Sequence, residues 1–156
     1  MAVYYTDKSR SFATAGGVGL NGQEQCAIAI VAMTTAMLDN ADDEVGLFYL
    51  PKGAIVTGAT ISATDMDTGA AALSIDVGDD DDEDRIFAAA LVGQAATLST
   101  ALAVAGHLYK YTTRTLIKAY VKVAAATAAA GTLSVSVRYI VDPEFSTTAL
   151  TATTTA

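Results

Sequence analysis

The chain has 156 residues, a formal net charge of −8 and a hydrophobic fraction of 52%, but only 7% aromatic residues and no tryptophan. That charge argues against a protein that wraps nucleic acid, because phosphates would be repelled over much of the surface. The length suits one domain, and the composition predicts a thin core of Val, Ile, Leu and Tyr. A thin core is marginal by itself, so we expect assembly to add buried surface.

Charge is divided unevenly along the chain. Residues 39–84 hold thirteen acidic residues and the single base Lys52, whereas residues 107–141 hold five bases and no acid. Two interpretations stay open at this point. Folding can mix the two segments in space, or the acidic segment of one subunit can contact the basic segment of the next.

Neither export, a membrane span nor a disulfide is predicted. Residues 1–10 lack the basic-then-apolar pattern of a signal peptide. Residues 86–106 are uncharged and long enough to cross a bilayer, but they are mostly Ala, Gly, Ser, Thr and Gln, which gain little in lipid. Cys26 is the only cysteine, and its apolar neighbours predict a small buried thiol.

The first half of the chain predicts strands. Residues 25–38 mix helix formers with β-branched residues, and their pattern favours a strand. A strand over 45–50 ends at Pro51-Lys52-Gly53, and another over 54–64 places Ile55, Ala59 and Ile61 on one side. After a turn at 65–69, residues 71–77 alternate again between apolar and polar positions.

The second half begins ambiguously and ends clearly. The alanine-rich residues 86–105 predict a short helix or an irregular crossover, and alternation over 106–114 predicts a strand. Residues 117–123 and 131–141 alternate strictly, and the Ala/Gly-rich link 124–131 can reverse the chain. We therefore predict a long hairpin.

Seven or eight short strands without a sustained helical period predict an all-β fold, an antiparallel β-sandwich of jelly-roll type. We assign residues 1–23 to an N-terminal arm, 24–143 to the sandwich and 144–156 to a C-terminal tail. The arm and the tail are polar or rich in Thr and Ala, and we expect both to contact neighbouring subunits.

The sequence contains no convincing catalytic, cofactor or zinc site. His107 is the only histidine, and no serine lies in a Gly-x-Ser-x-Gly elbow. One cysteine and one histidine cannot build a structural zinc site. The glycines of residues 17–22 match the dinucleotide fingerprint, but no apolar strand precedes them. We predict that the protein is not an enzyme and binds no cofactor.

Seven carboxylates crowd into residues 76–84. A solvated, self-repelling loop partly neutralised by Arg85 is the favoured interpretation. Clustered carboxylates could also bind calcium, with Asp79, Asp81 and Glu83 as candidate ligands, although the glycine and glutamate positions of an EF-hand loop are missing.

Aromatic and basic side chains predict an interface. Tyrosines that recur along the chain suit either subunit contacts or a sugar-stacking platform, and the lack of tryptophan disfavours the latter. The predicted interface residues are Tyr4, Tyr5, Lys118, Tyr120, Lys122 and Phe145.

Three stretches resemble a known group of proteins: the Leu-Pro-x-Gly turn and strand of residues 50–56, the Val-Gly and acidic Asp-Arg loop within 73–85, and the Gly-x-Leu-x-Val-x-Val strand of 131–140. They are similar to structural proteins of tailed-phage virions, of the capsid decoration or cement type. The resemblance implies a jelly-roll-like protein on the outer surface of the capsid, often a homotrimer, that contacts the major capsid protein and transfers no catalytic residue. The alternative is a head-fibre, tail or glycan-adhesive receptor-binding component of the virion.

Overall fold

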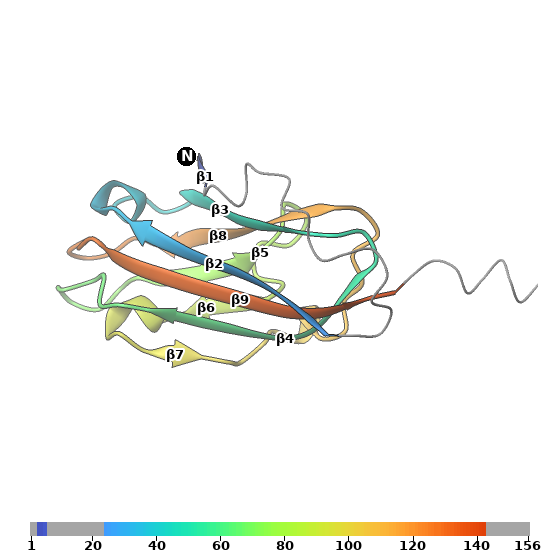
Figure 1. Ribbon diagram of the computed structural model, residues 1–156. Helices are drawn as coiled ribbons and strands as arrows, with labels where there is room; N and C mark the ends of the chain where they lie inside the picture. The colour runs from blue at the N-terminus through green and yellow to red at the C-terminus, as the bar shows by residue number, and fades with distance from the viewer. Residues whose placement is uncertain (1–2, 6–23, 143–156) are drawn as a thin grey trace, which may run out of the picture.

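The protein is a two-layered β-sandwich (Figure 1). The structure is a computed structural model and describes residues 3–5 and 24–142. One sheet has the strand order β1-β3-β8-β5-β6 and the other the order β2-β9-β4-β7. The strands are β1 (Val3–Tyr5), β2 (Gln25–Met33), β3 (Glu44–Leu50), β4 (Ala54–Ala63), β5 (Ser74–Gly78), β6 (Phe87–Ala90), β7 (Leu98–Ser99), β8 (Thr115–Val123) and β9 (Gly131–Val141).

The pairing of strands β2 to β9 defines a jelly roll. Antiparallel pairs form between β2 and β9, β3 and β8, β4 and β7, and β5 and β6, each pair nested inside the one before. Strands β9 and β4, and β8 and β5, then join these pairs into the two sheets. The predicted jelly-roll β-sandwich is confirmed. Strand β1 adds a short parallel strand beside β3.

Alternate side chains of the long strands fill the space between the sheets. The inward residues of β9 are Leu133, Val135 and Val137, each at most 1% exposed, and those of β8 are Ile117, Ala119 and Val121. The period of two in these strands therefore predicted the core correctly. The predicted strands over 25–38, 45–50 and 54–64 are also present, the first ending at Met33.

The predicted hairpin of the last third is wrong. Strands β8 and β9 belong to different sheets, because β8 pairs with β3 and β5 while β9 pairs with β2 and β4. The link 124–130 therefore crosses from one layer to the other, as Figure 1 shows. Alternation identifies a strand and its buried face, but it carries no information about which strand lies alongside.

The segment 86–114 also differs from the prediction. Residues 86–105 contain β6, β7 and two 3₁₀ turns, η2 (Val92–Gln94) and η3 (Val104–Gly106). Residues 106–114 form no strand, since Leu108 adopts a left-handed φ of 55° that interrupts extended backbone. A third 3₁₀ turn, η1 (Thr35–Met37), follows β2. Within the described residues, no helix is long and apolar enough to span a membrane.

A bulge in β4 changes which of its residues face the core. The register with β9 shifts between Val56 and Gly58, so Val56, Ala59 and Ile61 are buried whereas Ile55 is only half-buried. The predicted grouping of Ile55 with Ala59 and Ile61 is therefore wrong, because one extra residue reverses the alternation.

The predicted burial of Cys26 is wrong too, since this residue is exposed on the outward face of β2.

One buried carboxylate ties two loops together at one end of the sandwich. Asp67 is 2% exposed, and its two oxygens accept hydrogen bonds from the backbone N–H groups of Thr127, Ala72 and Leu73 at 3.0, 2.7 and 2.9 Å. These N–H groups lower the pKa of Asp67 well below its usual value, because they stabilise the charged form. The carboxylate thus joins loop 64–73 to the link between β8 and β9.

The substitution D67N tests this role. An amide keeps the size of the side chain but turns one of its acceptors into a donor that faces backbone N–H groups, so we expect a melting temperature several degrees lower at neutral pH. A folded-state pKa below the unfolded value stabilises above the unfolded pKa and loses this effect as pH falls. The difference between wild type and D67N, measured by thermal melts, should therefore stay constant from about pH 7 to about pH 5 and shrink as the pH falls below about 4. An unchanged difference would contradict the role of the charge.

Candidate functional site

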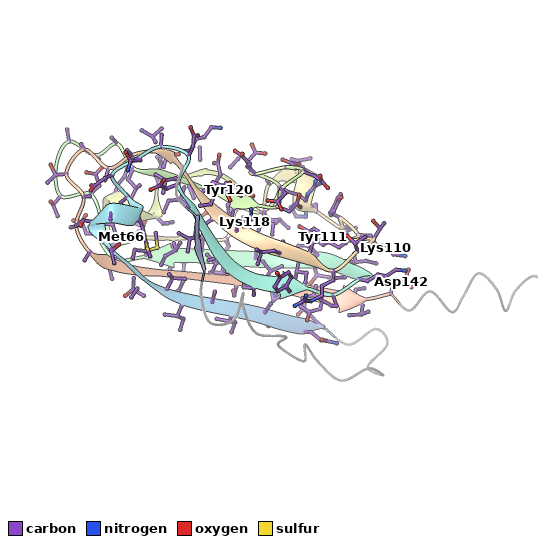
Figure 2. The ribbon with its side chains drawn as sticks, turned by 90° about the horizontal axis from the view of Figure 1, so that it is seen from above. Met66, Lys110, Tyr111, Lys118, Tyr120 and Asp142 are labelled. Atoms are coloured by element: carbon purple, nitrogen blue, oxygen red, sulfur yellow. The ribbon has the colours of Figure 1, made fainter. Side chains whose placement is uncertain are left out.

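The outward face of the β3-β8-β5 sheet carries charged residues in register. Glu44 on β3 and Asp76 on β5 both lie opposite Tyr120 of β8. One step along β8, Lys118 lies opposite Gly46 and Gly78, which have no side chain to crowd it. Figure 2 shows Lys118 and Tyr120 midway along the sandwich, between Met66 at one end and Lys110 with Asp142 at the other.

Lys118 is the buried cation of this face. It is 8% exposed, and its Nζ donates to Glu44 Oε2 at 2.8 Å and to Asp80 Oδ1 of the acidic loop. Burial alone would lower the pKa of Lys118, but the hydrogen bonds to Asp80 and Glu44 outweigh it and raise that pKa. Lys118 therefore stays charged and holds the acidic loop against the sheet.

The acidic loop is folded rather than loosely solvated. Asp79 is 2% exposed, and its Oδ1 accepts the backbone N–H groups of Asp81 and Asp82 at 3.0 and 3.1 Å. The loop returns so close to Gly78 that a Cβ there would lie 2.1 Å from the carbonyl oxygen of Asp82. A hydrogen bond shared with Asp84 raises the pKa of Asp82, which reduces repulsion between neighbouring carboxylates.

Arg85 neutralises the base of this loop. Its Nε donates to Asp79 Oδ2 at 2.7 Å, and its guanidinium carbon lies 3.8 Å from the ring centre of Tyr109. Burial would lower the pKa of Arg85, but the bond to Asp79 outweighs it and raises that pKa. The predicted neutralisation by Arg85 is thus correct, whereas the predicted solvated loop describes only the exposed carboxylates, namely Asp80, Asp81, Glu83 and Asp84.

Two adjoining depressions lie beside the loop, and we call them together the acidic depression. Their volumes are about 390 and 250 Å³, and Glu83 and Lys122 line both. Tyr120 lines the smaller one; it is 4% exposed, and its hydroxyl is buried without a hydrogen-bond partner. Burial and the nearby charge of Asp80 raise the pKa of Tyr120, so this hydroxyl stays protonated. The remaining lining residues are Asp42, Glu44, Asp76, Asp80, Asp81, Asp84 and Val121.

The candidate calcium ligands Asp79, Asp81 and Glu83 do not form a metal site. Asp79 is occupied by Arg85 and backbone N–H groups, while Asp81 and Glu83 are exposed on the loop. Across the described residues, no three His, Cys, Asp or Glu side chains are arranged to hold a metal ion.

Folding mixes the two charge segments of the sequence. Lys118, from the basic segment, pairs with Glu44 and Asp80 of the acidic one. The first of the two interpretations of the split charge therefore applies within the subunit. A net acidic surface remains beside β8.

The outward face of the other sheet lacks charge over its central rows. Ile30 on β2, Ser134 on β9 and Ser62 on β4 lie in one row, which Leu98 of β7 extends. The neighbouring row holds Ile28, Ser136 and Thr60. Ile30 is 70% exposed and Leu98 62%, so apolar side chains flank a strip of hydroxyls. We call this surface the uncharged face.

Sequence reasoning missed the uncharged face although strand β2 carries its signal. Cys26, Ile28, Ile30 and Ala32 point outward, while Ala27, Ala29, Val31 and Met33 point inward. Both sets are apolar, whereas an edge strand with one solvated face normally alternates apolar with polar residues. Strand β2 is therefore apolar on both faces, although its outward face is exposed in the subunit.

The six residues predicted to form an interface do not lie on one surface. Lys118 and Tyr120 are buried, Lys118 in contact with Asp80 of the acidic loop, and Lys122 is exposed at the acidic depression. Tyr4 and Tyr5 belong to β1, beside Val45 and Gly46 of β3. Phe145, like most of the N-terminal arm and the C-terminal tail, lies outside the described residues.

Comparison with solved structures identifies phage capsids. A chain of the capsid asymmetric unit of cyanophage Pam1 is 34% identical, and the match covers 88% of this chain and 98% of the Pam1 chain with a TM-score of 0.69. A chain of the capsid of Ralstonia phage GP4 is 24% identical, covers 91% and 99%, and has a TM-score of 0.77. A chain of the acidic stable capsid of Helicobacter pylori bacteriophage KHP30, at 18% identity, covers 78% and 90% with a TM-score of 0.53.

These matches define the class of the protein. The GP4 and KHP30 chains share the fold, and the Pam1 chain is similar in sequence over nearly its whole length. The protein belongs to the same family as this cyanophage capsid component and is a structural protein of the phage virion. No protein-family model matches the chain, and no curated protein does.

The substitution K118M tests the buried charge pair. Removing the ammonium leaves Glu44 buried without its partner, so we expect unfolding to become easier by about 3 kcal/mol. The exposed Lys122 lies two residues further along the same strand, and K122M is the matched control, expected to change stability by less than about 0.5 kcal/mol. The double variant K118M/E44Q should recover part of the loss. Equal effects of K118M and K122M in denaturant titrations would contradict the role of Lys118.

Proposed function

We propose that the protein decorates a phage capsid and cements it, through contacts with the major capsid protein and with copies of itself. The observation that carries this proposal is the similarity to a component of a phage capsid, which covers 88% of this chain and 98% of the Pam1 chain. The Pam1 chain is therefore matched almost completely by one jelly-roll domain of this size. A small separate domain with two different faces suits a subunit that binds a shell and its own copies.

The net charge supports a position on the outer surface of the capsid. A charge of −8, with exposed carboxylates gathered beside β8, is poorly suited to a surface that faces packaged nucleic acid. On the outside the same charge keeps the particles soluble and apart. We also propose, as the sequence predicts, that the protein binds neither nucleic acid nor a membrane.

The uncharged face supports contacts between copies. Two subunits that each carry −8 repel one another, and the central rows of this face allow contact without bringing carboxylates together. Strand β2 is at the edge of its sheet, and the exposed Ile30 lies on it. Exposed apolar side chains on an edge strand are a recognised site of association. We propose that copies meet here, with three subunits as the favoured number.

Stabilisation of the capsid would follow from mass action. A subunit that binds the assembled shell but not its separated parts shifts the equilibrium toward the closed particle. Contacts by the segments 1–23 and 144–156 with neighbouring subunits would enlarge the bound surface, as proposed from the sequence.

Particles produced without this protein test the proposal. Heads that lack it should open at a lower temperature or lower osmotic stress than wild-type heads, and adding the purified protein should restore resistance, because binding favours the closed shell. Quantitative mass spectrometry of intact heads should find many copies spread over the particle. A heat-denatured sample of the protein provides the control for non-specific addition.

A small copy number confined to one vertex or to the tail would contradict decoration. That result would favour the alternative, a head-fibre, tail or glycan-adhesive receptor-binding component, and glycan binding would then be the measurement to make. Unchanged head stability without the protein would contradict the cementing role.

The substitution I30D tests the contact between copies. A carboxylate in the middle of the uncharged face adds desolvation cost and repulsion to the interface, so the oligomer should dissociate to monomers in sedimentation or light-scattering measurements. V104D is the matched control, because Val104 is 91% exposed on η3 and does not belong to the rows that make up the uncharged face. Both variants should melt close to wild-type monomer. If the oligomer survives I30D but dissociates with V104D, the copies meet at the surface around Val104 and not at the uncharged face.

A further inference from the structure

We propose that the acidic depression is the contact site for a Lys- or Arg-bearing segment of the capsid protein to which the subunit binds. This inference deepens the proposed function and rests on it. A basic side chain of the partner enters beside Glu83 and Asp42, and its N–H group donates a hydrogen bond to the hydroxyl oxygen of Tyr120.

The Tyr120 hydroxyl is the feature that distinguishes this depression from an ordinary acidic surface. Its side chain is buried, lines the depression, and has no hydrogen-bond partner for the hydroxyl. An unpaired buried hydroxyl is costly, since it has given up its hydrogen bonds to water without replacement. A partner that supplies a donor at this point recovers that cost on binding.

The carboxylates around Tyr120 select a cationic donor. Asp42 and Glu83 are exposed, and both line the smaller depression together with Glu44. Glu44 is already paired with Lys118, whereas Glu83 also lines the larger depression with Asp81 and Asp84. Lys122 is the single base among these lining residues, so the local charge remains strongly negative.

A second copy of the chain is the less suitable occupant, because the basic residues in its described part are already engaged. Lys110 pairs with Asp142, Arg138 lies 3.8 Å from Glu24, and Arg85 with Lys118 hold the acidic loop. The guanidinium of Arg114 lies 3.6 Å from the ring centre of Tyr49. Lys52 also has a partner, and Lys122 lies in the depression itself. Lys8 and Arg10 lie outside the described residues, and no described base is left to enter the depression of a second copy. A basic segment of a different protein is therefore the favoured occupant.

Binding of purified variants to heads produced without this protein tests the inference. Y120F removes only the unpaired hydroxyl, so it should melt at or above the wild-type temperature and yet bind the heads roughly tenfold more weakly, the value of one hydrogen bond to a charged group. E83K should also weaken binding, and D39K is its matched control, since Asp39 is exposed outside the depression and the change in net charge is the same. Wild-type binding should weaken as salt is raised.

Each outcome of this experiment is decisive. Wild-type protein that does not bind these heads overturns the proposed function itself. If the wild type binds and Y120F and E83K bind equally well, the proposed function survives and the acidic depression is not the contact site. Loss of self-association in E83K would assign the depression to a second copy, and loss of wild-type binding on chelation would assign it to a divalent cation. Either result overturns the inference.

Discussion

The burial of one ammonium group organises the acidic side of this protein. Lys118 occupies a place between Gly46 and Gly78 on the outer face of its sheet, and it is held there by Glu44 and Asp80. A buried charge is tolerated only when it is paired, so the acidic loop must close over it. Loop residue Glu83 then lies at the acidic depression together with the buried Tyr120. Weakening the Lys118 pair would therefore disturb the loop, the depression and the shielding of the sheet together.

The sandwich gives its two outer faces opposite character. One face presents carboxylates around β8, and the other presents isoleucines and hydroxyls on β2, β9 and β4. In a protein with a net charge of −8, this segregation leaves one surface where copies can approach without repulsion and another that attracts cations. A virion component needs contacts of both kinds if it is to bind its own copies and a different protein.

Much of the fold, and less of the site, could be predicted from the sequence. Strict alternation in 117–123 and 131–141 identified β8 and β9 and their buried residues, because the period of a strand is a local property. Their assignment to one hairpin failed, since partner choice depends on the whole sandwich. The acidic loop was located correctly, but the burial of Asp79 depends on Arg85, Tyr109 and the close approach to Gly78, which only the folded chain brings together.

The two faces also differ in how their contacts respond to the solvent. Contact through the uncharged face depends on burying apolar surface, which added salt does not weaken. Contact through the acidic depression depends on partly exposed charges, and salt screens these within about 10 Å at ordinary ionic strength. If copies meet at the uncharged face and another protein binds at the acidic depression, as proposed, ionic conditions would adjust the second association and leave the first in place. The two proposed contacts lie on different sheets and share no residue, so a substitution in one is expected to leave the other association unchanged.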